Sequence, residues 1–143
     1  MGYGRFFDEL QLGQTFRHWP GRTITDFDDT LFSLLSMNQH PLHIDEHYAA
    51  GSQHGQRLVE GPIVISLVIG LSQADIGGSA LATLEYSEIR HSGPVFHGDT
   101  IYAASTVLEM DPPSGVVRLE HRGLNQRDET VLTMRRKIVL PRR

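Results

Sequence analysis

Histidine and carboxylate side chains, which can take up and release a proton, gather just before the longest apolar stretch of this 143-residue sequence. His43 and Asp45 lie close together, and Glu60 comes directly before Gly61. Gly61 begins the apolar stretch, and if that stretch is a helix, the free N–H groups and the dipole at its start favour negative charge. Pro62 has no N–H, so Gly61 is the outstanding donor there. Residue types like these fit a site that moves protons beside a developing anion.

Closely spaced histidines also raise the question of a metal site. His40 and His43 lie three residues apart, and His47 lies four further on. Imidazoles bind metals readily, but Pro41 opposes a helix that would present His40 and His43 together. We therefore expect no metal here. The sequence contains no cysteine, which excludes disulfides, thiolate metal sites and cysteine nucleophiles.

Three helical segments are expected to position these residues. The first begins at Thr25, a good N-cap followed by aspartates, and its pattern stops at Met37-Asn38. A second, short helix is expected over 45–50. The stretch from Gly61 to Gly78 contains β-branched residues, but its length, its early proline and its Gly-Gly end favour a helix of about 15 residues. Since it is apolar nearly all round, it should be buried on most sides. The apolar residues of the first helix, on one face, are Phe27, Leu31, Leu34 and Leu35.

The second half of the sequence has the alternating pattern of strands. Strands are expected over 81–91, 100–110, 116–125 and 130–140, and one more over 16–23. Short connections rich in glycine, proline and aspartate imply an antiparallel sheet. Such a sheet, curled around one long central helix, is the α+β arrangement called the hot-dog fold. One edge of the sheet would remain open, so we expect a homodimer or a higher homo-oligomer that continues the sheet.

Length and composition fit a single domain over residues 1–143. Apolar residues make up 39% and charged residues 21%. The net charge is −4, and the basic residues are scattered apart from a short run at 135–137, so we expect no nucleic-acid partner. The longest apolar stretch, 63–71, falls short of the roughly 20 residues of a membrane span, and the N-terminus lacks a signal-peptide pattern. We therefore expect a cytoplasmic protein with no membrane partner.

Three segments, in matching order and spacing, resemble the MaoC-like and R-specific enoyl-CoA hydratase family. Residues 35–45 read L-S-M-N-Q-H-P-L-H-I-D, which resembles the family's signature L-S-G-D-x-N-P-L-H-x-D. Residues 58–61 read L-V-E-G, similar to the I-V-H-G that opens the family's central helix. Residues 93–100 read G-P-V-F-H-G-D-T, similar to P-V-F-x-G-D. The resemblance covers residues 6–140 and also implies the hot-dog fold.

The resemblance implies an enzyme that reversibly hydrates a 2-enoyl-CoA thioester. This reaction places a hydroxyl on Cβ and a proton on Cα while negative charge builds on the thioester oxygen. By resemblance, His43 is the catalytic acid/base and the Gly61 N–H contacts the oxyanion. The family uses no metal, and coenzyme A would enter only as part of the acyl-CoA substrate, not as a cofactor.

The sequence departs from the family at several positions. Asn38 stands where the family has an aspartate that helps to activate water, and an amide can hold a water but cannot act as a base near neutral pH. His40 replaces an asparagine and Glu60 a histidine. Three interpretations follow. His43 transfers protons alone while Asn38 orients the water; or Glu60, Asp45 or His40 replaces the aspartate; or hydration has been lost and the pocket only binds a thioester. We favour the first two.

The segment M-N-Q-H-P-L-H resembles the hydratases of branched C5-dicarboxylyl thioesters, such as mesaconyl-CoA or itaconyl-CoA. Such a substrate has an extra carboxylate, which needs cationic or hydrogen-bonding groups. The candidate substrate-binding residues are His40, Arg90 and His91, together with Glu60 beside the helix glycine. Two other functions stay open: an acyl-CoA thioesterase in which Glu60 would activate water, and a non-catalytic subunit that binds acyl thioesters.

Overall fold

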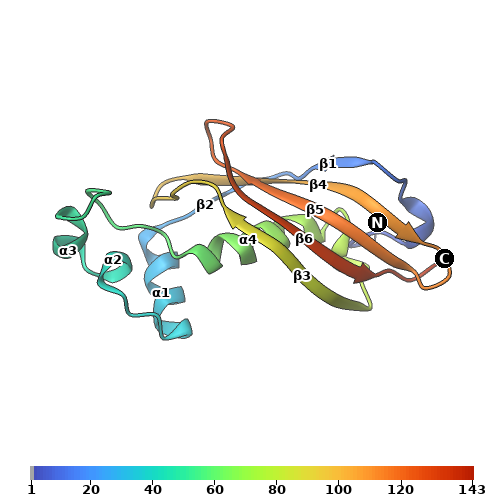
Figure 1. Cartoon of the computed structure of the whole chain (residues 1–143), viewed down its shortest axis with the longest axis horizontal. Coiled ribbons are helices and arrows are strands. Elements are labelled where there is room, and N and C mark those ends of the chain that lie inside the picture. Colours follow the sequence, from blue (N-terminus) through green and yellow to red (C-terminus); the bar gives the residue numbers. More distant parts are fainter. Residues whose placement is uncertain (1) are drawn as a thin grey trace.

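The computed structural model describes residues 2–143; Met1, the first residue of the predicted domain, lies outside the described residues. A curled antiparallel sheet wraps around helix α4 (Gly61–Gln73), and three shorter helices extend from one end (Figure 1). This confirms the expected α+β hot-dog architecture. The strands are β1 (Thr15–Arg17), β2 (Arg22–Thr23), β3 (Ala82–His91), β4 (Thr100–Asp111), β5 (Val116–Leu124) and β6 (Thr130–Val139). The other α-helices are α1 (Asp26–Ser36), α2 (Pro41–Ile44) and α3 (Glu46–Ala50), and two short 3-10 helices lie at Phe7–Glu9 and Gly77–Ser79.

The sheet has the order β1-β4-β5-β6-β3, with every neighbouring pair antiparallel, and β2 also pairs with β4. The four long strands begin and end within one residue of the predicted ranges. The single strand predicted over 16–23 is wrong in detail, because it is two short strands, β1 and β2. Pro20 lies between them and has no N–H to donate to a sheet ladder.

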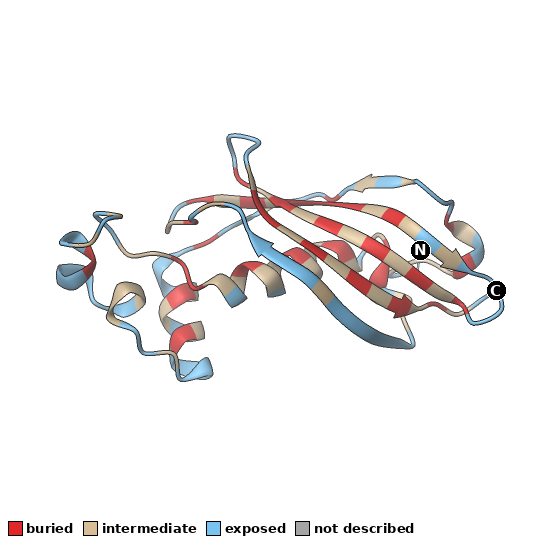
Figure 2. Cartoon of the chain, viewed as in Figure 1, coloured by how far each residue is buried: buried red, intermediate tan, exposed pale blue. Residues whose placement is uncertain are grey.

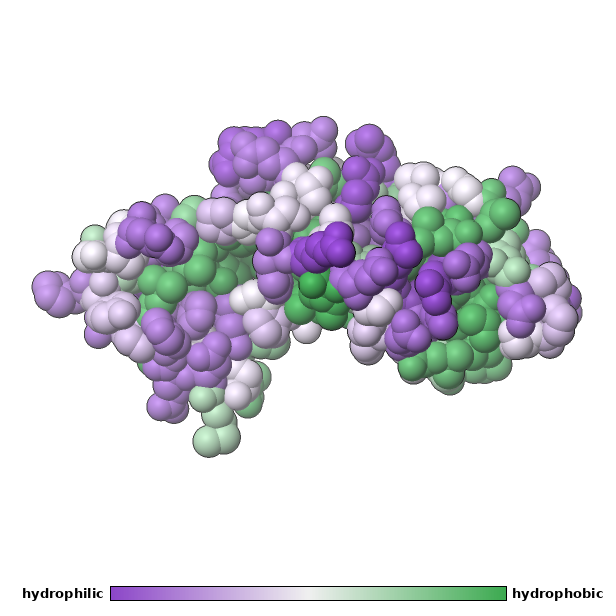
Figure 3. Space-filling model, viewed as in Figure 1, coloured by the Kyte–Doolittle hydropathy of each residue, from purple (hydrophilic) through white to green (hydrophobic). Residues whose placement is uncertain are grey.

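Strand β3 forms one edge of the sheet and is exposed along nearly its whole length (Figure 2). Its apolar side chains are not covered: Leu84 is 56% exposed and Tyr86 is 51% exposed. Figure 3 shows apolar surface around the start of this strand. An unpaired apolar edge of this kind is a ready surface for another strand.

Helix α4 packs on the inner face of the sheet and leaves one stripe of residues exposed. Val64, Val68 and Ser72 are buried against the strands, whereas Pro62, Ser66 and Gly70 are exposed on the opposite side. Residues between these two sides, such as Ile65 and Ile69, are partly buried against the core, so the expectation that this helix is buried on most sides is confirmed except along the exposed stripe. The helix also ends at Gln73, earlier than the predicted Gly-Gly end. Within residues 2–143, no helix is both long and apolar enough to cross a membrane.

Helix α1 begins where the sequence predicts. Thr25 is its N-cap, and the backbone N–H of Thr25 donates to the Asp28 carboxylate at 2.8 Å while the Asp28 N–H donates to the Thr25 hydroxyl at 3.3 Å. This reciprocal pair satisfies two free donors of the first turn. The helix buries Asp29 and Ser33, whereas the apolar face is largely uncovered, with Leu35 75% exposed.

A polar layer lies between two apolar clusters on the inner face of the sheet. Along β4 and β5, Ser105 and His121 occupy inward positions between apolar neighbours, and Arg136 does so on β6. His18 joins them: its Nδ1 lies 2.6 Å from an Asp75 carboxylate oxygen and its Nε2 2.8 Å from the Ser105 hydroxyl. The Ser105 hydroxyl lies 2.6 Å from His121 Nδ1. Hydrogen bonds thus support most of the buried polar groups in this layer.

Candidate active site

The three motif segments, far apart in the sequence, meet at the start of α4. Leu58 forms an isolated β-bridge with Phe96, and the Val59 N–H donates to the Val95 carbonyl at 2.9 Å. The Leu58 N–H also donates to the carbonyl of Leu42, in α2, at 3.2 Å. Backbone hydrogen bonds therefore hold the histidine-rich segment and the segment before β4 on either side of the chain that leads into α4.

These contacts enclose a small pocket of about 130 Å³. It is lined by residues 58, 59, 61, 64 and 93–95 together with the two histidines His43 and His91. Among the described residues that line it, only these two imidazoles have polar side-chain atoms. Three of the residues proposed from the sequence, His43, Gly61 and His91, are thus brought together in one place.

His43 lies in α2, a helix that the sequence analysis missed. Pro41 opposes a helix that contains both His40 and His43, as predicted, and His40 lies outside α2; Pro41 is itself the first residue of α2, where its missing N–H costs nothing. His43 Nδ1 lies 2.7 Å from the Leu58 carbonyl oxygen, which has only lone pairs, so Nδ1 donates. The neutral ring then has its lone pair on Nε2, which is free to accept a proton.

Gly61 is the first residue of α4, so its N–H has no acceptor within the helix. The backbone just before it is held from α1. The N–H of Glu60 donates to Oδ1 of Asp29 at 2.9 Å, and Oδ2 of Asp29 lies 2.7 Å from His97 Nε2. Asp29 is completely buried. These contacts anchor the backbone of the residue before Gly61.

Sequence reasoning missed the roles of Asp29 and His97. Asp29 figured only as one of several charges in the first turn of a helix, and the apolar face of that helix pointed to burial on the other side. His97 belongs to the third motif segment but stands at a variable position of its pattern. No local signal distinguishes the two residues from solvent-exposed ones.

Glu60 has its carboxylate directed at α1 and is not among the described residues that line the pocket. It is 3% exposed, and its carboxylate oxygens accept from the hydroxyls of Ser33 and Ser36, each at 3.2 Å. These hydrogen bonds tie α1 to the start of α4. In this structure Glu60 is a buried link between two helices.

His40 and Asn38 lie in the segment that leads into α2. His40 is the N-cap of α2: its Nδ1 accepts from the Leu42 N–H at 3.1 Å, and its ring centroid lies 6.0 Å from that of His43. The Asn38 side-chain oxygen accepts from the His40 N–H at 3.4 Å. Asn38 is close to the site in the chain but does not line the pocket formed by the described residues.

Asp45 and Arg90 point elsewhere. The Asp45 carboxylate caps α3 by accepting from the Tyr48 N–H at 2.9 Å, which confirms the short helix expected there. Arg90 is exposed on β3, one residue before His91, and does not line the pocket. Across residues 2–143, no group of three or more histidine and acidic side chains is placed to hold a metal ion.

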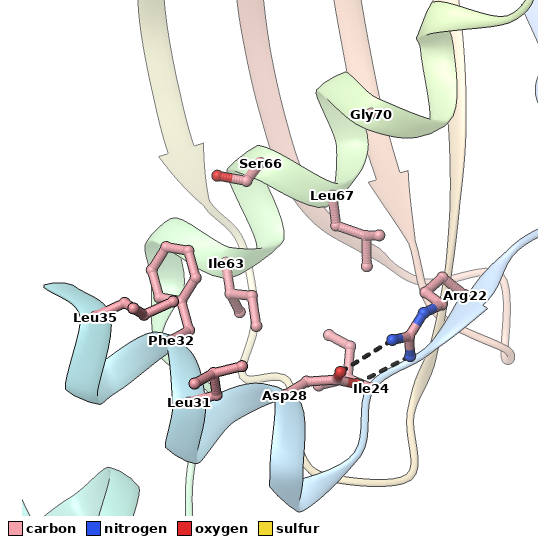
Figure 4. Close-up of a pocket in the computed structure, with 10 residues that line it drawn as sticks. All are labelled: Arg22, Ile24, Asp28, Leu31, Phe32, Leu35, Ile63, Ser66, Leu67 and Gly70. Atoms are coloured by element: carbon pink, nitrogen blue, oxygen red, sulfur yellow. Dashed lines mark hydrogen bonds and ion pairs between the residues drawn. The ribbon is translucent and has the colours of Figure 1, made fainter.

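A larger pocket of about 370 Å³ lies between α1 and the side of α4 that the sheet leaves uncovered (Figure 4). Its wall is mostly apolar, with Leu31 and Leu35 from α1 and Leu67 from α4. Arg22 and Asp28 form a two-pronged ion pair at its edge, with both N···O distances 2.9 Å. The Arg22 guanidinium holds the pKa of Asp28 below its usual value. This pocket offers apolar surface rather than reactive groups.

Comparison with known proteins adds independent information. The family model described as "MaoC like domain" matches residues 8–136. The chain is 35% identical to a mesaconyl-CoA hydratase of Cereibacter sphaeroides and 32% identical to a beta-methylmalyl-CoA dehydratase of Chloroflexus aurantiacus, in each case over 98% of the chain. Its structure superposes on the R-hydratase PhaJ1 from Pseudomonas aeruginosa with a TM-score of 0.86 and 27% identity, covering 96% of this chain and 86% of that one.

The two curated relatives are much longer than this chain. The matched region covers 42% of the mesaconyl-CoA hydratase and 41% of the beta-methylmalyl-CoA dehydratase. The chain therefore spans about two fifths of the length of the curated relatives it matches.

Proposed function

The chain belongs to the MaoC-like domain family, and we propose that it catalyses the reversible hydration of a 2-enoyl-CoA thioester. The observation that carries the proposal is the pocket that His43 and Gly61 both line, in which the Leu58 carbonyl holds His43 Nδ1 and so leaves the lone pair on Nε2. A proton acceptor beside an anion-stabilising helix start suits this addition.

The proposed reaction follows from these two groups. His43 Nε2 takes a proton from a water molecule, and the water oxygen forms a bond to Cβ of the enoyl group. The electron pair of the Cα–Cβ double bond moves toward the thioester oxygen, where the Gly61 N–H and the dipole of α4 stabilise the charge. His43, now protonated at Nε2, returns this proton to Cα, and the reverse sequence eliminates water. Asn38 is proposed to orient the water, a role that rests on its position in the motif.

We propose a C5-dicarboxylyl thioester as the acyl group. Support comes from the two relatives named for mesaconyl-CoA and beta-methylmalyl-CoA. Of the candidate substrate-binding residues, His91 lines the pocket and His40 lies beside the His43 ring. The proposal does not rely on Glu60, whose carboxylate is engaged by α1, or on Arg90. Because Glu60 faces away from the pocket, the geometry also gives no support to a thioesterase.

We further propose that the active form is a homodimer in the cytoplasm, with coenzyme A present only as part of the substrate. The exposed edge strand β3, with its apolar side chains, supports pairing with a second copy. The uncovered apolar face of α1 supports it as well. The absence of cysteine fits a reducing compartment.

A hydration assay tests the proposal. Crotonyl-CoA, mesaconyl-CoA and itaconyl-CoA are offered to the wild-type protein and to the His43→Ala and Asn38→Asp variants. We expect turnover of a C5-dicarboxylyl substrate that His43→Ala lowers by about 10²- to 10⁴-fold. Turnover of crotonyl-CoA alone, increased by Asn38→Asp, would restrict the function to a general hydratase. Activity that is indifferent to His43, or release of free CoA thiol, would refute the mechanism.

A further inference from the structure

His91 occupies an unusual place beside Gly61. It is the last residue of β3, and the strand end is held by pairing of His91 with Leu132 on β6 and by the Ser92 N–H, which donates to the Val131 carbonyl at 2.9 Å. A Cβ atom added to Gly61 would lie 2.9 Å from Cε1 and 3.0 Å from Nε2 of the His91 ring. The edge of the imidazole therefore lies directly against the backbone of Gly61.

The pocket is short of donors for a developing anion. Pro62 has no N–H, so the start of α4 offers the Gly61 N–H without a second backbone donor beside it. Among the described pocket residues, the only side-chain donors are the two imidazoles. His43 Nδ1 donates to Leu58, and its Nε2 must carry a lone pair to accept the proton of water. His91 is therefore the remaining side chain of the described pocket that can donate a hydrogen bond to the anion.

We propose that His91 Nε2–H donates a second hydrogen bond to the thioester oxygen and completes the oxyanion site with the Gly61 N–H. This inference rests on the proposed hydratase function and assigns His91 to its transition state. A neutral imidazole suffices, because the task is to donate a hydrogen bond and no proton leaves the ring. A Cβ at residue 61 would require the ring of His91 to move.

A pair of substitutions separates this role from proton transfer and from packing. His91→Gln keeps an N–H donor but cannot exchange a proton near neutral pH, whereas His91→Phe keeps a ring without a donor. We expect kcat/KM for enoyl-CoA hydration to fall about 10²- to 10³-fold in His91→Phe and less than tenfold in His91→Gln. The matched controls are His47→Gln and His47→Phe on α3, because His47 is exposed like His91 but is not among the described residues that line the pocket. Equal losses in both His91 variants, or no loss in either, would overturn the proposal.

Ligand binding gives a readout that does not need turnover. Butyryl-CoA has a neutral thioester oxygen, whereas the enolate of acetoacetyl-CoA carries charge on its oxygens. We expect His91→Phe to weaken binding of the enolate at least tenfold and to change binding of butyryl-CoA by less than threefold, as for a donor that matters most when charge is present. Equal effects on the two ligands would contradict the proposal. If wild type hydrates no enoyl-CoA, the proposed function fails, and this comparison still decides the role of His91.

Discussion

Asp29 Oδ1 accepts a hydrogen bond from the backbone N–H of Glu60 across 2.9 Å and so links the first turn of α1 to the residue before Gly61. The same carboxylate holds His97, from the segment before β4, through its other oxygen at 2.7 Å. One buried side chain thus connects three segments around the candidate active site. The position of the oxyanion donor depends on a residue that does not line the pocket.

Replacing Asp29 should therefore lower stability and activity together. Asp29→Ala leaves the buried Glu60 N–H without an acceptor, so we expect the free energy of unfolding to fall by about 1–3 kcal/mol. Asp29→Asn keeps one acceptor oxygen and should lose less. Urea denaturation measures the change, and Asp26→Ala, at an exposed position of the same helix, is the control. The link has no energetic role if Asp29→Ala is as stable as Asp26→Ala.

Two glycines should respond to alanine in opposite directions. A Cβ on Gly70, inside α4, would meet nothing within 4 Å, whereas a Cβ on Gly123 would lie 2.8 Å from the Val68 side chain. Gly70→Ala should stabilise the protein by about 0.5–1 kcal/mol, because alanine loses less backbone entropy in a helix. Gly123→Ala should destabilise it by about 1–3 kcal/mol through overpacking. Urea denaturation measures both changes in stability. If Gly70→Ala loses stability, the exposed side of α4 must be packed against another group in solution, which the added methyl displaces.

Stability should depend on pH through His121. Burial, reinforced by the charges of Arg136 and His18, lowers the pKa of His121 from 6.5 to about 3. Between these two pH values, His121 is protonated in the unfolded chain and neutral in the folded protein. The contribution of His121 is therefore complete above pH 6.5 and is lost as the pH falls toward 3, by at most ~1.4 kcal/mol per pH unit.

The His121→Gln variant isolates this contribution. Glutamine can still hydrogen-bond to Ser105 but does not titrate. Unfolding free energies measured in urea at several values between pH 7 and pH 5 should fall more steeply for wild type than for the variant. Parallel curves would mean that His121 is protonated in the folded protein or exposed to solvent.

The proposed dimer should depend on the edge of the sheet. Leu84→Lys places a charge on the exposed strand β3, so we expect this variant to sediment as a monomer where wild type sediments as a dimer. Leu12→Lys is the control, since Leu12 is also exposed but precedes β1, at the opposite edge of the sheet. A dimer that survives Leu84→Lys and dissociates in Leu12→Lys would place the interface at the β1 edge and contradict the prediction.

Local sequence was sufficient to predict most of the secondary structure and part of the site. The alternation of apolar residues located the four long strands, and Thr25 located the start of α1, because both signals act over a few neighbouring residues. The start of α4 at Gly61 followed from Pro62 and the apolar run. The short helix α2 was missed, because a proline that interrupts one helix can equally begin the next.

Only the tertiary structure determined which face of each element has a partner. Apolar spacing selected one face of α1, yet Asp29 on another face is buried, by partners 31 and 68 residues away in the chain. His91 reaches Gly61 because β3 pairs with β6 and ends above the start of α4. A polar side chain is buried when its hydrogen-bonding partner arrives from elsewhere in the fold. The position of that partner depends on the path of the whole chain, so it cannot be predicted from a short stretch of sequence.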